Sequence, residues 1–415
     1  METGRHFCKE RQPFVRHLTE GNSTIPITTA WGRRIEASSN AASSMLFSVA
    51  LGIGFVAIPL LALEENYDAA QIGLLIALAA VSQMIARSFM GMLLRRAPDK
   101  VFVIVSCLLV AASCGVLVLW TSLAAFVLSQ LAQGVARAFF WTGIQTHAVR
   151  VARTPVGGLA AMNIAGGLGA LIGPVIAGLA SEFSTQLALD MGVAAGVLTL
   201  IPAAVLVKLP TFETRHKGQG MLWRRPGVSA TCWTAVGTGA WRGVLNSYVP
   251  VALALVAQPA STIGILVAIA NAATLVGSAI SGWVRRAGIN GSLLIGTLAT
   301  GLGTAVIGIL AGFTVAIALA LIVSGIGAGI LQTVGPAVAT ELVHPEERGD
   351  IIASVGLFRA AALFAAPAGM AGIVLVAPIS AAFVVAGALV MLPIVSLRSI
   401  PTNRMTSSRM DSTRG

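Results

Sequence analysis

Charged residues are scarce in this sequence of 415 residues. Asp, Glu, Lys and Arg together make up 10% of it, whereas they make up about a quarter of an average soluble protein. Apolar residues make up 56%, and the mean hydropathy is +0.86. A water-soluble enzyme is therefore excluded, and lipid is the expected solvent for most of the chain.

Cysteine and cofactor-binding motifs are also scarce. The four cysteines lie in apolar runs or near the N-terminus, which excludes a disulfide framework and a zinc site with ordinary ligand spacing. No Gly-x-x-x-x-Gly-Lys loop is present to bind phosphate, and the pairs Gly301/Gly303 and Gly325/Gly327 lie inside apolar runs rather than after a strand. We therefore expect no metal, cofactor or nucleotide site.

The sequence is instead rich in long apolar runs. Twelve of them reach the roughly 20 residues that cross a ~30 Å hydrocarbon core. They cover residues 41–63, 70–93, 101–120, 123–147, 156–180, 186–207, 230–256, 261–284, 291–312, 315–339, 351–376 and 379–398. Because the runs lack a two-residue alternation, we expect helices rather than barrel strands. The predicted fold class is an all-α integral membrane protein with 12 transmembrane helices.

The positions of the basic residues predict the orientation of these helices. With the N-terminus in the cytosol, 23 of the 27 Lys and Arg residues fall in cytosolic segments, none falls in an outside loop, and four lie within the spans. Basic residues collect in the cytosolic loops of membrane proteins. The net charge of +11 is therefore an orientation signal and does not indicate nucleic-acid binding.

One polar segment divides the membrane part in two. Residues 208–229 contain Pro210, His216 and five basic residues, and they predict a cytosolic loop between a six-helix bundle at 41–207 and another at 230–398. Residues 1–40 lack the apolar core of a cleavable signal, so we expect a basic, disordered cytosolic tail there and a second tail at 399–415.

The two halves repeat each other at a constant spacing. The segment 71–96 aligns without a gap with 262–287. The pairs 191 residues apart are Gly73/Gly264, Gly91/Gly282, Arg95/Arg286, Gly134/Gly325 and Gly158/Gly349. A constant offset of this kind indicates duplication of a six-helix unit.

Two parallel six-helix repeats with cytosolic termini and a basic central loop resemble the major facilitator superfamily over residues 38–398. The resemblance implies a multi-pass transporter of the cell membrane that works by alternating access. It also implies a monomer that has a small-molecule substrate and membrane lipid as its partners.

The segment after the second span resembles the family's Gly-x-x-x-Asp-(Arg/Lys)-x-Gly-Arg-(Arg/Lys) motif. The matching residues are Gly91, Arg96 and Lys100, and the replaced positions are Arg95 for the acid, Pro98 for the second Gly and Asp99 for the Arg. In the family this loop latches the cytosolic side of the outward-facing state. The resemblance implies a latch with exchanged charges, in which Arg95 pairs with Asp350 or Glu347. Alternatively, Arg95 and Arg96 only set the orientation.

The span 156–180 is similar to the family's Gly-x-x-x-Gly-Pro-x-x-Gly-Gly antiporter motif. The matching residues are Gly169, Gly173, Pro174 and Gly178, and Ala177 replaces one glycine. Glycines four residues apart permit close helix approach, and proline bends a helix. The motif implies the branch of 12-helix proton antiporters that export drugs or metabolites; packing without a transport role is the alternative. In the span 123–147, Gln130 replaces the Arg of the exporters' Arg-x-x-Gln-Gly motif, which weakens the transfer of a standard proton-antiport mechanism.

Four arginines lie within the predicted spans: Arg87, Arg137, Arg242 and Arg359. Each costs ~2.5 to 3.5 kcal/mol at a helix centre. Arg87 and Arg359 lie about 12 to 13 Å along their helices from a charged residue at the cytosolic end, so their side chains are expected to reach toward water. Arg137 and Arg242 lie about 20 and 25 Å from one, near the midplane.

Polar and aromatic side chains accompany the two central arginines at every fourth position. The resemblance places them on a central cavity. The expected substrate-binding residues are Gln133, Arg137, Trp141, Trp241, Arg242, Asn246 and Gln332, with Asn271 at the flank. No Asp or Glu lies well inside a span, and Asp190, near the outer side, is the possible proton site. Two cations without a carboxylate favour an anionic ligand; structural bonding of each Arg is the alternative.

These observations predict export of a small amphiphilic organic anion with proton coupling, the proton moving with a weak acid or through Asp190. An uptake carrier or uniporter for an anionic nutrient is the alternative. A membrane enzyme is not expected, because no nucleophile, metal cluster or acid–base pair is found at one depth.

Overall fold

The computed structural model describes residues 30–152, 155–211, 222–225, 227–343 and 348–397. The helices of the first half are α1 (Ala30–Glu64), α2 (Ala69–Arg96), α3 (Asp99–Leu119), α4 (Leu123–Val151), α5 (Pro155–Ser181), α6 (Thr185–Leu198) and α7 (Leu200–Val205). Those of the second are η2 (Leu222–Arg224), α8 (Val228–Leu255), α9 (Ala260–Val284), η3 (Arg285–Ala287), α10 (Gly288–Leu310), α11 (Thr314–Glu341), α12 (Arg348–Val374), α13 (Ile379–Met391) and α14 (Ile394–Leu397). The described residues contain no strand, so the all-α prediction is confirmed.

Polar residues start several helices at the ends of the apolar runs. Asp68 and Gln71 form a reciprocal capping box at the start of α2, and the side chains of Ser122 and Ser184 accept backbone hydrogen bonds at the starts of α4 and α6. These side chains satisfy backbone N–H groups that a helix leaves unpaired in its first turn. These caps allow α2, α4 and α6 to begin directly after short turns.

Two of the predicted spans are each divided into two helices. The predicted span 186–207 forms α6 and α7, which meet at Thr199, and 379–398 contains α13 and α14. A proline lies just after the first break, at Pro202 of α7, and another within the second break, at Pro393. A proline ring clashes with the carbonyl four residues earlier, and this explains why the first helix of each pair ends there.

α1 begins at Ala30, whereas the sequence analysis assigned residues up to 40 to a disordered tail. The search for apolar runs missed this part because it is polar. Three of its polar side chains are nevertheless buried: Glu36 is 2% exposed, Asn40 6% and Ser39 8%. They pack against protein rather than lipid, which an average over hydropathy does not detect.

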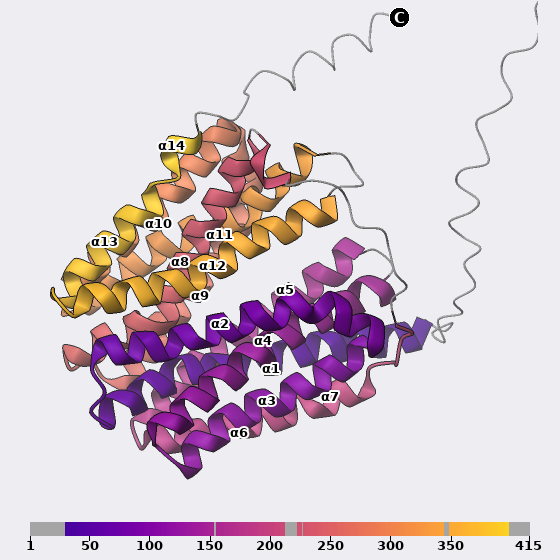
Figure 1. The fold of residues 1–415 in the computed structure, drawn as a ribbon, viewed down its shortest axis with the longest axis horizontal. Coiled ribbons are helices and arrows are strands. Elements are labelled where there is room, and N and C mark those ends of the chain that lie inside the picture. The colour runs from indigo at the N-terminus through magenta and orange to yellow at the C-terminus, as the bar shows by residue number, and fades with distance from the viewer. Residues whose placement is uncertain (1–29, 153–154, 212–221, 226, 344–347, 398–415) are drawn as a thin grey trace, which may run out of the picture.

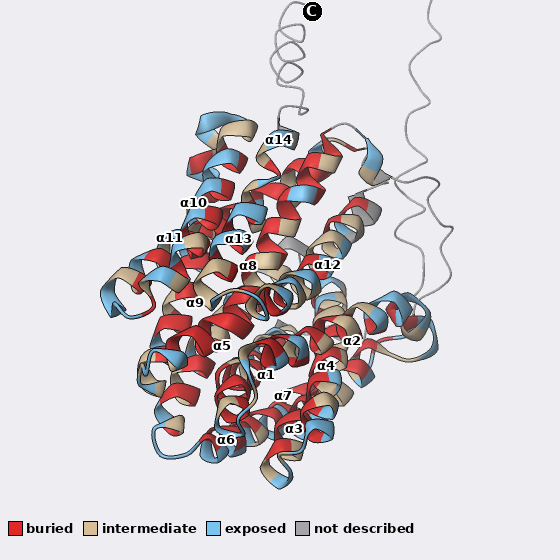
Figure 2. Ribbon diagram, turned by 60° about the vertical axis from the view of Figure 1, so that its left-hand side comes forward, coloured by how far each residue is buried: buried red, intermediate tan, exposed pale blue. Residues whose placement is uncertain are grey.

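Nine segments of the described chain are long and apolar enough to cross a membrane, one of which, Ala260–Leu310, covers both α9 and α10. Figure 1 shows the helices of the first half, α1–α7, grouped on one side and most of those of the second half on the other. In Figure 2 buried residues lie where helices meet and exposed residues follow their outer faces. Many of the exposed residues are large and apolar, including Leu74, Ile85, Leu302 and Ile309, as expected for a surface in lipid.

The duplication is visible in the packing. A Cβ atom added at Gly134 of α4 would lie 2.9 Å from the carbonyl carbon of Ala79 on α2. One added at Gly325 of α11 would lie 2.7 Å from the carbonyl oxygen of Ala270 on α9. Both the two glycines and the two alanines are 191 residues apart in sequence, so the same close contact recurs in each bundle.

Candidate functional site

The two ends of the helical bundles differ in charge. One end carries Arg95, Arg96, Arg150, Lys208, Arg224, Arg225, Arg285 and Arg286, and the other carries Glu64, Glu65, Asp68 and Glu182. We call them the basic end and the acidic end.

The two bundles are in close contact at the acidic end. A Cβ atom at Gly264 of α9 would lie 2.9 Å from the Cα of Gly178 on α5. The backbone N–H of Ser261 donates a 2.8 Å hydrogen bond to Oε1 of Glu182, and this bond lowers the pKa of the exposed Glu182 carboxyl. Gly73 of α2 lies against the side chain of Tyr248 on α8. The acidic end is therefore closed.

The glycines of the antiporter-like motif face two different helices. A Cβ atom at Gly173 would lie 2.5 Å from the carbonyl oxygen of Val49 on α1, and one at Gly169 would lie 2.8 Å from the Cβ of Ser48. Gly178 instead contacts α9 of the other bundle, where a Cβ atom would lie 2.5 Å from the carbonyl oxygen of Ala260. The predicted close helix approach is confirmed, within one bundle and between the two.

Open space adjoins three glycines toward the basic end, as it also adjoins Gly312 and Gly369 toward the acidic end. A Cβ atom added at Gly91, Gly282 or Gly356 would meet no atom within 4 Å, and both Arg95 and Arg96 are exposed. The predicted acidic partners of Arg95 are Glu347 and Asp350. Glu347 and the side chain of Asp350 lie outside the described residues. The pairing of Arg95 with either acid stays a prediction.

Arg242 lies on α8 beside an amide and an aromatic ring. Its Nη1 donates a 2.9 Å hydrogen bond to Oδ1 of Asn271 on α9, and its guanidinium lies 5.6 Å from the ring centroid of Trp241. Trp241 and Asn246 are buried. One amide oxygen neutralises no charge, so Arg242 keeps a full positive charge inside the bundle.

Arg137 of α4 is 7% exposed and has weaker support. Its guanidinium lies 5.6 Å from the ring centroid of Phe55 on α1, and its Nε has no hydrogen-bond partner among the described residues. Nε2 of the neighbouring Gln133 is likewise buried and unpaired. Trp141, one turn further along, is half-buried and packs edge-on against Phe140. These unpaired donors can bind an anion.

Arg87 and Arg359 are electrostatic neighbours of the two central arginines. The charge of Arg359 acts on those of Arg242 and Arg87, and the charge of Arg87 acts on that of Arg137. The positions of this outer pair along their own helices predict only that the side chains reach toward cytosolic water. No ion pair between described residues includes any of the four.

Two other predicted site residues, Gln332 and Asp190, lie apart from the contacts described above. Gln332 of α11 is half-buried, and Asp190 of α6 is exposed. The hydrogen bond and ring contacts of the central arginines involve neither residue, so their roles in substrate and proton binding stay predictions.

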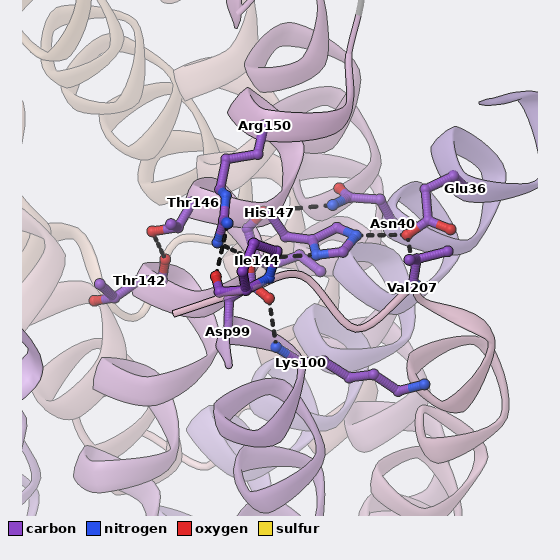
Figure 3. A network of polar contacts seen from close by, with 11 residues as sticks. Glu36, Asn40, Asp99, Lys100, Thr142, Ile144, Thr146, His147, Arg150 and Val207 are labelled. Atoms are coloured by element: carbon purple, nitrogen blue, oxygen red, sulfur yellow. Dashed lines mark hydrogen bonds and ion pairs between the residues drawn. The ribbon is translucent and has the colours of Figure 1, made fainter. Parts of the chain in front are cut away.

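A second polar cluster lies at the basic end of the first bundle (Figure 3). His147 of α4 is fully buried, with Nε2 2.5 Å from Oε1 of Glu36 and Nδ1 3.4 Å from Oδ2 of Asp99. Nη1 of Arg150 lies 3.5 Å from the same oxygen of Asp99. Two buried carboxylates and two basic side chains thus join the ends of α1, α3 and α4.

The same cluster holds the chain that leads out of the first bundle. The backbone N–H of Val207 donates a 3.0 Å hydrogen bond to Glu36, and Nη2 of Arg150 donates a 2.7 Å bond to the carbonyl of Pro210. The sequence analysis missed this cluster, although Asp99 in place of the family's Arg was a signal that a basic partner lay nearby. No group of three or more His, Cys, Asp or Glu side chains in the described ranges is placed to hold a metal ion.

Comparison with known proteins identifies the fold. The chain is similar to the nucleoside transporter NupG, with a TM-score of 0.73, 14% identity, and coverage of 88% of this chain and 98% of that one. It is also similar to a bacterial homolog of the human lysosomal transporter Spinster in an inward-facing and unoccupied conformation (TM-score 0.65, 13% identity, 89% and 95% covered). A transporter of the POT family in complex with 5-aminolevulinic acid gives a TM-score of 0.67 at 13% identity, with 88% and 95% covered.

At these identities the solved structures show the fold alone. No match to a curated protein sequence is found. The sequence profile of the Major Facilitator Superfamily matches residues 41–367, which is most of the chain. The helices, the duplication and this match agree: the chain belongs to the major facilitator superfamily of membrane transporters.

Proposed function

We propose that this transporter exports a small amphiphilic organic anion across the cell membrane and that export is coupled to protons. The observation that carries the proposal is the pair formed by the buried Arg137 and the half-buried Arg242, which have no carboxylate partner among the described residues. A guanidinium in a poorly solvated site binds carboxylate or phosphate through two parallel hydrogen bonds. Trp241 and Phe55 beside these groups offer contacts for the apolar part of such a ligand.

The direction and the coupling rest on sequence. The glycine and proline pattern of α5 resembles the antiporter motif and supports export. The basic end is the cytosolic end if basic residues follow the rule for membrane proteins, and the conformation described here then faces the cytosol. A proton travels with a weakly acidic substrate or binds Asp190, and the functional unit is a monomer.

In the alternating-access cycle that we propose, the anion enters from the basic end and binds the central arginines. The contacts of α5 with α9 at the acidic end then separate. The segment at the α2–α3 junction that contains Gly91, Arg95, Arg96 and Lys100 closes the basic end against the start of α12. A ligand shifts this equilibrium only as far as it binds one conformation better than the other.

Uptake or uniport of an anionic nutrient is the second candidate. The observation that favours it is Gln130, which is buried on α4 at the position of the exporters' Arg. Both candidates use the same anion site and differ in the direction of transport and in coupling.

The test uses the full chain in liposomes of known orientation with an imposed pH gradient. Internal pH is followed while matched panels of organic anions and lipophilic cations are added, and Arg137→Ala, Arg242→Ala and the exposed control Arg286→Ala are compared with the parent. Proton flux that anions evoke, and that only the first two variants lose, supports the proposal. Flux that cations evoke, unchanged in every variant, would overturn it; anion movement without proton flux would favour the second candidate.

A further inference from the structure

Two more arginines lie beside the proposed anion site, each slightly nearer the basic end than a central arginine. On α8, a Cβ atom at Gly239 would lie 3.0 Å from the carbonyl carbon of Arg359, so Arg359 of α12 is level with Gly239. Arg242 lies three residues further along α8, about 4.5 Å toward the acidic end. The second bundle therefore holds arginines at two depths.

The first bundle has the same arrangement. Gly134 of α4 packs against Ala79 and Ser82 of α2, and these two helices run in the same direction. Arg87 follows Ser82 by five residues, about 7.5 Å, and Arg137 follows Gly134 by three, about 4.5 Å. Arg87 is thus about 3 Å nearer the basic end than Arg137.

The two outer arginines connect the bundles. α2 and α12 belong to different bundles and pack against each other (Figure 1), and the charges of Arg87 and Arg359 act on one another. Neither guanidinium forms a hydrogen bond or ion pair with a described residue. Four positive charges therefore extend from one bundle to the other without a negative charge among them.

We propose that the four arginines select a ligand with at least two negative charges, such as a phosphate monoester or a dicarboxylate, and that Arg87 and Arg359 are the specificity-determining pair. This inference rests on the proposed function and narrows its substrate to a multivalent amphiphilic anion. A single negative charge would leave three of the four guanidinium groups without a counter-charge. An unpaired charge is costly where water is scarce, as at the buried Arg137 and the half-buried Arg242 and Arg359; Arg87 is exposed. A second anionic group, placed nearer the basic end, pairs with the outer arginines of both bundles.

The test compares ligands that differ by one charge and share an apolar body. Dansyl aspartate carries two carboxylates and dansyl glycine one; phenyl phosphate is a dianion at pH 8 and methyl phenyl phosphate a monoanion. Binding to the detergent-purified full chain is measured by energy transfer from tryptophan to the dansyl group, and for the phosphates by displacement of dansyl aspartate. The variants are Arg87→Gln, Arg359→Gln, the double variant, Arg137→Gln at the proposed anion site and the exposed control Arg286→Gln.

We expect at least one dianion to bind the parent at least tenfold more tightly than its monoanion partner. This preference should fall below threefold in the double variant, while the monoanion affinity changes less than threefold; the control should match the parent. The phosphate and carboxylate pairs show which dianion chemistry is accepted. Equal binding of both charges, still lost in Arg137→Gln, would overturn this inference and leave the proposed function standing. If neither the monoanions nor the dianions bind, both this inference and the proposed function would be overturned.

Discussion

A methyl group added at Gly264 should destabilise the conformation in which the acidic end is closed. Its Cβ atom would lie 2.9 Å from the Cα and 3.1 Å from the backbone N of Gly178, and backbone atoms cannot rotate away as a flexible side chain can. Overpacking of this kind costs about 1–3 kcal/mol. At 1.4 kcal/mol per factor of ten, the closed population should fall about 5- to 140-fold relative to the open one.

The distance between spin labels across the acidic end measures this change. Glu65 follows α1, and Phe313, which is 69% exposed, precedes α11; both become labelled cysteines in a chain whose native cysteines are serines. Gly264→Ala should move the distance distribution toward longer separations. The matched control is Gly282→Ala on the same helix, where an added Cβ meets no atom within 4 Å. Identical distributions in the two variants would refute the assignment of this contact as the closure.

Three further predictions concern charged groups. His147→Ala leaves two buried carboxylates without their shared partner and should lower the free energy of unfolding by about 3–5 kcal/mol; an unchanged thermal midpoint in detergent would contradict this. The pKa of Glu182 is lowered because its carboxylate accepts the N–H of Ser261, so the carboxylate stabilises the closed acidic end above its ordinary pKa of 4.5 and this contribution is lost as the pH falls through the lowered value. Label distances should therefore depend on pH below 4.5 in the parent and not in Glu182→Gln. Glu341→Gln breaks the exposed pair with Arg285 and should cost less than about 1 kcal/mol; a larger loss in thermal unfolding would show that the pair is more than a surface contact.

Much of the fold could be predicted because lipid imposes a simple rule on the sequence. A helix that crosses the membrane must be apolar over a fixed length, so apolar runs locate spans such as α3 and α11. The rule fails where protein replaces lipid as the surroundings. The first turns of α1 are polar and yet buried around Glu36, and hydropathy assigned them to a tail.

The candidate site was predictable in its members but not in its contacts. A spacing of four residues predicts that Gln133, Arg137 and Trp141 share one face of a helix. The contact of Arg137 with the ring of Phe55 on another helix could not be predicted from this spacing. The sequence gives only the distance of Arg87 and Arg359 from the ends of their own helices, so it does not predict that the two charges interact. The two side chains belong to α2 and α12, which pack against each other although they are in different bundles. Spacing along one helix cannot predict how two bundles pack.

The most direct test of the central claim, an anion site on Arg137 and Arg242, is the equilibrium binding of dansyl aspartate to the purified protein. Energy transfer from tryptophan reports it, because Trp241 lies beside Arg242. We expect saturable binding that Arg137→Gln and Arg242→Gln each weaken at least tenfold, no change in Arg286→Gln, and no saturable binding of the uncharged dansyl amide. Equal binding of both ligands to the parent and to all three variants would contradict the claim.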